Sequence, residues 1–307
     1  MTIALDHGVT YFGHRRNVRL RNEEVELVLP TEFGPRVMRY ARLGGENVLA
    51  EIDPTSQRVA TPYGDDWHIY GGHRLWLAPE HAERSYYPDN APVALEELAS
   101  GVRLRQEVEA HTGIEKQLAV ELAPQGSKVR VTHSLTNRGH APRELSPWAL
   151  TAMRPGGRAI FPHAPFVPHP TALAPARPLV LWPFTRMADP RWTWGDRTFC
   201  LRQDPALEAP QKVGCYDLVG AMAYALPGET FLKRHEPRSG RHADFGCNVQ
   251  TFTNAHFLEL ETLGPMVVLA PQQSVEHVEH WRLFEGDRFD GDDDARAAAL
   301  AALIAAP

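Results

Sequence analysis

Two glutamates, Glu259 and Glu261, are the first candidates for acid–base chemistry in this sequence. They lie two residues apart in an otherwise apolar run that reads HFLELETLGP from His256 to Pro265. Successive side chains of a β-strand point to opposite faces, so the two carboxylates share one face of the predicted strand. Burial and a neighbouring carboxylate both raise a carboxyl pKa, which would suit proton transfer near neutral pH. The same pattern leaves open a half-exposed strand with a solvated acidic face.

A second candidate is the segment DDWHIYGGHRLWLAPEH, from Asp65 to His81. Its Gly-Gly pair permits positive φ or close backbone approach, and it is followed directly by His73 and Arg74, with Trp76 two residues further on. A titratable imidazole and a fixed cation beside an aromatic ring suit a polar ligand with apolar faces, such as a sugar. The alternative is a turn followed by a strand whose histidine is merely solvated.

Trp148, His163, Lys212 and Lys233 complete the set of candidate binding residues. Trp148 lies on a predicted strand, where its ring would either stack on a pyranose or fill the core. A Gly-Gly turn then leads to His163. Each lysine lies near the end of a predicted strand and is expected to be solvated unless it coincides with the site.

The densest histidine cluster does not predict a metal site. It reads VEHVEHW and ends at Trp281, and the odd spacing of His277 and His280 would place them on opposite faces of a strand. His277 and Glu279 would share a face, but two ligands are too few. The sequence also has neither a Gly-rich phosphate loop nor a GxSxG nucleophile elbow. We therefore expect no metal, no other cofactor, and no nucleotide-dependent or serine-hydrolase chemistry.

Short alternating or β-branched runs, separated by Gly, Pro, Asn and Asp, are the elements that must position these residues. They predict an all-β antiparallel sandwich or barrel, and no linker-like tract divides residues 1–307, so we expect a single domain. The acidic start and strong helix formers of DGDDDARAAALAALIAAP predict one short C-terminal helix packed on the sandwich. The Pro-rich region from Pro155 to Leu201 is expected to form loops at the rim of a concave face.

The composition of the chain limits the classes of partner that it is expected to bind. The chain has 307 residues, 43% of them hydrophobic, and a formal net charge of −6, which argues against binding to nucleic acid or to anionic membrane surfaces. Its three cysteines form no CxxC pair, and the N-terminus lacks the pattern of a secretory signal. We expect a cytoplasmic protein, monomeric or homodimeric, that acts on a small molecule.

The order of segments resembles the galactose mutarotase-like superfamily, the aldose 1-epimerases and their relatives. The resemblance covers about Asn22 to Phe284: FGPRVMRYARLGGENVL, GGHRLWLAPE, HSLTNRG followed by PWALTAM, FLELETLGP and LAPQQSVEHVEHWRLF. It implies a β-supersandwich fold. In aldose 1-epimerases the acidic strand carries a catalytic glutamate in a Leu-Glu-Thr context, which Leu260, Glu261 and Thr262 match.

This resemblance implies an isomerase that interconverts sugar anomers, in which a glutamate takes the proton of the C1 hydroxyl and a histidine protonates the ring oxygen. Glu261 would be the base, and Glu259 its pKa modulator, a hydroxyl acceptor or the base itself. The family's acid histidine is missing, because the matching place reads SPWALTAM with Trp148. His73 is its nearest replacement by position.

The resemblance also implies that Arg74 would hold sugar hydroxyls or an anionic group, and that Lys212 and Lys233 would favour an anionic sugar. Two alternatives of other classes stay open. One is a carbohydrate-binding protein without catalysis, and the other is a lyase acting on acidic sugars.

Overall fold

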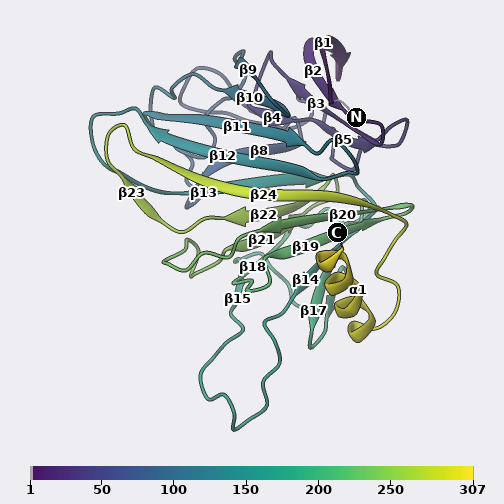
Figure 1. Ribbon diagram of the computed structural model, residues 1–307. Helices are drawn as coiled ribbons and strands as arrows, with labels where there is room; N and C mark the ends of the chain where they lie inside the picture. Colours follow the sequence, from purple (N-terminus) through teal and green to yellow (C-terminus); the bar gives the residue numbers. More distant parts are fainter. Residues whose placement is uncertain (1–2, 307) are drawn as a thin grey trace.

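A computed structural model describes residues 3–306 and shows two large antiparallel β-sheets stacked on each other (Figure 1). The ten-stranded sheet has the order β16 (Trp192–Trp194), β17 (Thr198–Arg202), β14 (Arg158–Pro162), β19 (Ala221–Leu226), β20 (Glu229–His235), β24 (Ser274–Glu285), β12 (Val129–Asn137), β11 (Ile114–Leu122), β10 (Gly101–Arg105) and β9 (Ala94–Leu98). The second sheet has the order β15 (Leu179–Leu181), β18 (Gln211–Cys215), β21 (Val249–Thr253), β22 (Leu258–Leu263), β13 (Arg143–Met153), β8 (His73–Ala78) and β4 (Arg36–Val37), and β23 (Val267–Leu269) pairs with β13. We call it the eight-stranded sheet.

Side-chain alternation explains why the two sheets stack. On β22, Leu258 and Leu260 point to the ten-stranded sheet and join a core that includes Val131 and Trp281 of that sheet. Phe257 and Leu263 belong to a separate apolar cluster on the opposite face. Fully burying a large apolar side chain contributes about 1.5–3 kcal/mol, so many such residues fix the strand register. The predicted antiparallel sandwich is confirmed.

Smaller elements pack against the sandwich. They are a four-stranded sheet of β1 (Ala4–Tyr11), β2 (His14–Arg21), β3 (Val25–Pro30) and β5 (Arg39–Arg42), a two-stranded sheet of β6 (Arg58–Val59) and β7 (Trp67–His68), and the helix α1 (Asp293–Ala305). Asp292 caps α1 by accepting a hydrogen bond from the Ala295 amide, and Leu300 and Leu303 pack on the outer face of the ten-stranded sheet. The predicted C-terminal helix is confirmed.

The Pro-rich region contains strands as well as the predicted loops. Although we expected loops throughout Pro155 to Leu201, β14 and β17 lie inside the ten-stranded sheet. The prolines explain the difference, because only Pro162 falls within β14, at its last residue, and most of the others lie after it. Residues 163–178 do form a loop, which projects from the body (Figure 1).

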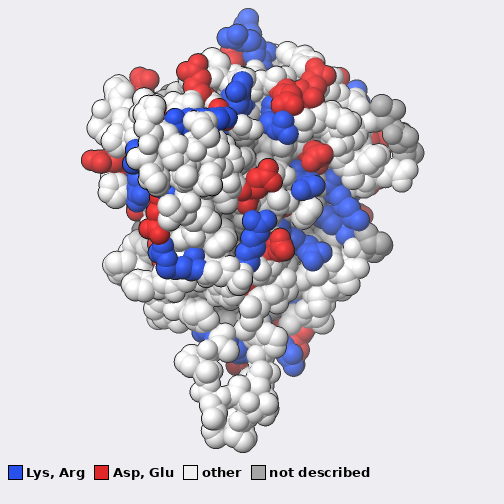
Figure 2. Space-filling view, turned by 60° about the vertical axis from the view of Figure 1, so that its left-hand side comes forward, with Lys and Arg blue, Asp and Glu red and all other residues white. Residues whose placement is uncertain are grey.

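Acidic and basic side chains are interspersed over the face that Figure 2 shows, and the tip of the projecting loop carries neither. Such a mixed surface has no large area of one sign that would attract a polyanion. Within residues 3–306, no helix is long and apolar enough to cross a bilayer.

Candidate functional site

Glu259 and Glu261 lie on the same face of β22, as the alternation predicts. Glu259 is paired across the sheet with Ala152 and Phe252, and Glu261 with Leu150 and Gln250. This face points away from the ten-stranded sheet, and we call it the pocket face. The central strands of the eight-stranded sheet therefore bring residues from distant parts of the chain around the two carboxylates.

An aromatic pocket of about 310 Å³ opens on the pocket face. Its lining combines large rings with a few buried charged groups, which is the composition of small-molecule sites. The lining residues are Gln57, Val59, Trp67, Ile69, Arg74, Trp76, Glu80, Tyr86, Trp148, Leu150, Trp182, Phe184, Lys212, Phe252, Asn254, Phe257 and Glu259.

A larger cavity, of about 810 Å³, lies on the outer face of the ten-stranded sheet beside α1. It is lined by residues such as Lys128, Arg130 and Arg234, and none of the predicted site residues is among its lining. We favour the smaller aromatic pocket as the site, because paired carboxylates and buried cations converge there.

Glu261 lies directly beneath the aromatic pocket. Its side chain is fully buried and does not line the cavity, but its Oε2 accepts hydrogen bonds from two lining residues: Trp148 Nε1 at 2.8 Å and Lys212 Nζ at 3.2 Å. Its Oε1 is buried and has no hydrogen-bond partner among the described residues. Burial raises the pKa of Glu261 to about 7, with Lys212 opposing the rise and Glu259 adding to it. The carboxyl is therefore poised to exchange a proton near neutral pH.

Glu259 lines the pocket and forms a buried ion pair with Arg74, with Oε1 and Nη1 2.9 Å apart. The Arg74 guanidinium lies 4.5 Å from the ring centre of Trp76 and 5.5 Å from that of Trp67. Apart from this contact, Arg74 Nε and Nη1 and Glu259 Oε1 lack hydrogen-bond partners in the described part of the chain. Buried groups of this kind are normally satisfied, so these atoms mark donors and an acceptor for a polar ligand.

The Gly-Gly pair ahead of Arg74 is required by the backbone. Gly71 and Gly72 have φ of 82° and 65°. A Cβ would lie 2.2 Å from the Ala50 carbonyl oxygen at Gly71 and 2.4 Å from the Val37 carbonyl oxygen at Gly72. Only glycine fits this close approach, which sets where β8 begins and hence the face on which Arg74 lies.

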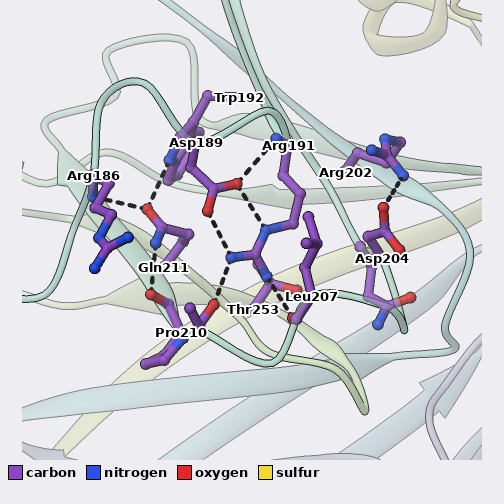
Figure 3. Close-up of polar contacts among 12 residues, drawn as sticks. Arg186, Asp189, Arg191, Trp192, Arg202, Asp204, Leu207, Pro210, Gln211 and Thr253 are labelled. Carbon is purple, nitrogen blue, oxygen red and sulfur yellow. Dashed lines mark hydrogen bonds and ion pairs between the residues drawn. The ribbon is translucent and has the colours of Figure 1, made fainter.

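Lys212 is held by a firmly anchored strand. The preceding residue, Gln211, accepts hydrogen bonds through Oε1 from the Arg186 amide at 2.9 Å and from Trp192 Nε1 at 3.1 Å (Figure 3). Arg191 is buried, pairs with Asp189 and donates to the carbonyl of Leu207 on the way to β18 (Figure 3). This network fixes the backbone from which the Lys212 side chain reaches the pocket.

His73 and Lys233, which we expected in the site, lie on the other side of the eight-stranded sheet. His73 precedes Arg74 on β8, so alternation turns it into the space between the sheets, where it is fully buried. Lys233 projects inward from the ten-stranded sheet, and its Nζ donates to Glu279 Oε1 at 2.8 Å and to the Leu260 carbonyl at 3.1 Å. The structure does not bring either residue to the pocket.

These two residues instead join a polar cluster between the sheets. His73 Nε2 lies 2.6 Å from His133 Nε2, and His73 Nδ1 lies 2.8 Å from Thr151 Oγ1. Burial lowers the pKa values of both histidines below their ordinary value, so both are neutral near neutral pH. Glu279 completes this inter-sheet cluster with an Oε2 that lies 4.0 Å from His73 Nε2.

The inter-sheet cluster has the donor types of a transition-metal site, because one atom each of His73, His133 and Glu279 lies within 4.8 Å of the others. However, the Glu279 carboxylate already pairs with the Lys233 ammonium. A dication would bury two further positive charges with no anion to balance them, which is strongly unfavourable. We therefore interpret the inter-sheet cluster as a self-satisfied polar network.

His163 also lies away from the aromatic pocket. It follows β14 in the ten-stranded sheet, and its ring packs 5.3 Å from that of Phe199. Sequence reasoning missed Trp67, Trp182 and Tyr86, which do line the pocket. Tyr86 and Trp182 lie in loops and Trp67 in the two-residue strand β7, so the only signal for them was the abundance of aromatic residues, and segments this short or irregular give no periodicity from which a facing direction could be derived.

Comparison with solved structures finds the same fold at very low sequence identity. A galactose mutarotase-like protein from Lactobacillus casei has a TM-score of 0.53 and 10% identity, covering 87% of this chain and 100% of that protein. A galactose mutarotase related enzyme from Lactobacillus acidophilus has a TM-score of 0.53 and 8% identity, covering 88% and 98%.

A TPR-domain containing protein from Parabacteroides distasonis has a TM-score of 0.59 and 15% identity. The match covers 87% of this chain but 47% of that protein, so the chain spans about half of its length. No protein-family model and no curated protein sequence matches the chain. The sheet topology and these structural matches together show that the chain has the galactose mutarotase-like fold.

Proposed function

We propose that the protein binds a sugar in the aromatic pocket and interconverts its anomers by acid–base catalysis. The observation that carries this proposal is Glu261, a buried carboxyl with a pKa of about 7 in direct contact with pocket-lining Trp148 and Lys212. A carboxyl that is present in both its protonated and ionised forms near neutral pH can take up and return a proton.

The pocket has the features needed to hold a sugar. The rings of Trp76, Trp148 and Trp182 offer apolar faces for the C–H groups of a pyranose. Arg74 Nε and Nη1 and Glu259 Oε1, which make no hydrogen bonds in the described part of the chain, offer donors and an acceptor for its hydroxyl groups. A cavity of about 310 Å³ accommodates one small sugar rather than a long polymer segment.

Glu261 is the base in this proposal. It takes the proton of the C1 hydroxyl as the ring opens, and it returns that proton when the ring closes on the other face of the aldehyde. A positioned base contributes about 10²- to 10⁴-fold to the rate. Glu259 lies closer to the cavity and is the alternative base, although Arg74 holds its carboxylate in an ion pair.

Saturation-transfer NMR of anomer exchange tests the proposal over a panel of neutral, phosphorylated and uronic sugars. We expect the wild-type protein to accelerate exchange of one sugar class and Glu261→Gln to remove at least about 10²-fold of that acceleration. Glu276→Gln, on the exposed side of β24, is the matched control and should retain full activity. Glu259→Gln separates the two carboxylates. Acceleration that survives in Glu261→Gln would refute the assignment of the base.

Carbohydrate binding without catalysis is the second candidate function. It is favoured by one observation: Glu261 does not itself line the cavity. This candidate predicts line broadening of a sugar signal on binding, with anomer exchange no faster than in buffer.

A further inference from the structure

Lys212 is a cation that lines the aromatic pocket and directly contacts the proposed base, Glu261. Its Nζ is 3.2 Å from Glu261 Oε2 and lies 4.8 Å and 4.9 Å from the ring centres of Trp148 and Trp182. The side chain is nine-tenths buried, yet it lines the cavity, whereas Glu261 lies directly beneath the lining. Lys212 is therefore positioned to contact both the buried carboxyl and a ligand in the cavity.

The other titratable groups that line the pocket are poorly suited to donate a proton. The guanidinium of Arg74 keeps its proton under all ordinary conditions. Burial raises the pKa of the Tyr86 phenol, whose hydroxyl donates to Glu80 at 2.6 Å. Glu259 is paired with Arg74. Among the described lining residues, this leaves Lys212 as the cation that can give up a proton beside Glu261.

From this geometry we infer that Lys212 is the general acid of the site and takes the role that a histidine has in the aldose 1-epimerases. The inference rests on the proposed function. As the C1–O5 bond of the sugar breaks, its electron pair takes a proton from Lys212 Nζ. At the same time Glu261 takes the proton of the C1 hydroxyl, and the O–H electron pair forms the C1 carbonyl. When the ring closes on either face of the aldehyde, the O5 hydroxyl returns its proton to Lys212, and Glu261 gives its proton back to the carbonyl oxygen.

The spacing of Lys212 and Glu261 fits the reacting atoms. The ring oxygen and the C1 hydroxyl oxygen are bonded to the same carbon, so the acid and the base must lie close together. Lys212 Nζ and Glu261 Oε2 are 3.2 Å apart, which is longer than the about 2.7–2.9 Å typical of a charge-assisted hydrogen bond. The contact can thus be exchanged for two contacts to the substrate, and hydrogen bonds of catalytic groups are often long before substrate binds.

Lys212→Arg provides the sharpest test, because arginine keeps the positive charge and its hydrogen bonds but does not release a proton. We expect Lys212→Arg to lower the rate constant for anomer exchange by about 10²-fold or more, while the Kd of the sugar changes by only a few fold. Lys128→Arg, on the exposed turn between β11 and β12, is the matched control and should exchange anomers at the wild-type rate.

The outcomes separate this inference from the proposed function. If the wild type accelerates exchange and Lys212→Arg keeps more than half of its rate, Lys212 has a structural or charge-only role and the inference is wrong. If the wild type accelerates exchange of none of the sugars, the proposed function and the inference fail together. A thermal melt of Lys212→Arg that matches the wild type would show that a lost rate is not lost folding, and Lys212→Met extends the test to a residue with no proton to give.

Discussion

The molecule contains two trios of the same three residue types, and they behave in opposite ways. On the pocket face, Glu261 accepts from Trp148 and Lys212, and both bonds go to Oε2. Between the sheets, Glu279 accepts from Trp281 through Oε2 and from Lys233 through Oε1, and Thr262 adds a further donor to Oε1.

The ionisation of the two glutamates follows from this difference. Burial raises the pKa of Glu261 to about 7, and Lys212 and Trp148 oppose this rise only in part; the second oxygen, Oε1, has no hydrogen-bond partner in the described part of the chain. Burial acts on Glu279 too, but Lys233 and the surrounding histidines outweigh it and hold the pKa below the ordinary value. A buried glutamate–lysine pair is therefore structural when every oxygen is satisfied, and available for proton transfer when one oxygen is left free beside a cavity.

Replacing the lysine of each trio in turn should produce the largest difference, in the free energy of unfolding. Lys233→Met leaves the ionised Glu279 buried without its cation, and we expect a loss of about 3–5 kcal/mol in the free energy of unfolding. Lys212→Met should cost only about 1 kcal/mol, because Glu261 can take up a proton and become neutral. Urea unfolding at neutral pH compares the two variants. Equal losses would contradict the distinction between the trios.

The pH dependence of stability should separate the two glutamates next. Glu261 has a folded-state pKa of about 7 against an ordinary value of 4.5, so the folded protein binds more protons than the unfolded chain between these values. Stability from this group is fully present below pH 4.5 and is lost as the pH rises through about 7. Glu261→Gln should remove this loss, which amounts to a few kcal/mol at about 1.4 kcal/mol per pKa unit. Urea midpoints of the wild type and Glu261→Gln, measured across this pH range, test the assignment, with Glu276→Gln as the control. If Glu261→Gln loses stability with rising pH as steeply as the wild type does, the assignment is wrong.

The inter-sheet histidines should act in the opposite direction. Burial lowers the pKa values of His73, His133 and His277, so the unfolded chain takes up protons below about pH 6.5 that the folded protein cannot. Stability from these groups is present above that pH and is lost as the pH falls. We expect His277→Gln to flatten the acid decline, whereas His140→Gln, on an exposed turn, should leave its slope unchanged. Thermal melts at a series of acidic pH values measure the slope.

The smallest effect should come from Trp148→Phe. This change removes the hydrogen bond from Nε1 that favours the ionised form of Glu261. We expect the pKa of Glu261 to rise by no more than about two units, since a hydrogen bond to a charged group contributes about 1.5–3 kcal/mol and one pKa unit corresponds to about 1.4 kcal/mol. The acid limb of the pH–rate profile should move to higher pH by the same number of units. A downward shift would show that Trp148 does not stabilise the carboxylate.

Most of what the sequence correctly predicts about this molecule follows from the alternation of side chains along strands. It placed Glu259 and Glu261 on one face and indicated the antiparallel sandwich, and helix-forming residues after acidic ones indicated α1. The same rule would also have separated His73 from Arg74, since adjacent strand residues face opposite sides. His73 and Arg74 are therefore neighbours in the sequence but lie on opposite faces of the sheet.

The inter-sheet cluster lay beyond sequence reasoning for a different reason. His73, His133, Lys233 and Glu279 come from four strands, β8, β12, β20 and β24, and only the order of strands in the two sheets brings them together. The loop residues of the pocket, such as Trp182, depend on long-range contacts in the same way. Local patterns give faces and elements, whereas these contacts are set by sheet order and packing.

A titration of the two glutamate side chains, followed by the ¹³C NMR signals of their carboxyl carbons, tests the central claim most directly. Glu261→Gln and Glu279→Gln would assign the two signals. We predict that the Glu261 carboxyl titrates near pH 7, while the Glu279 carboxyl stays ionised throughout the range in which the protein is folded. A Glu261 signal that stays in its ionised position down to about pH 5 would contradict the claim that this trio is built for proton transfer.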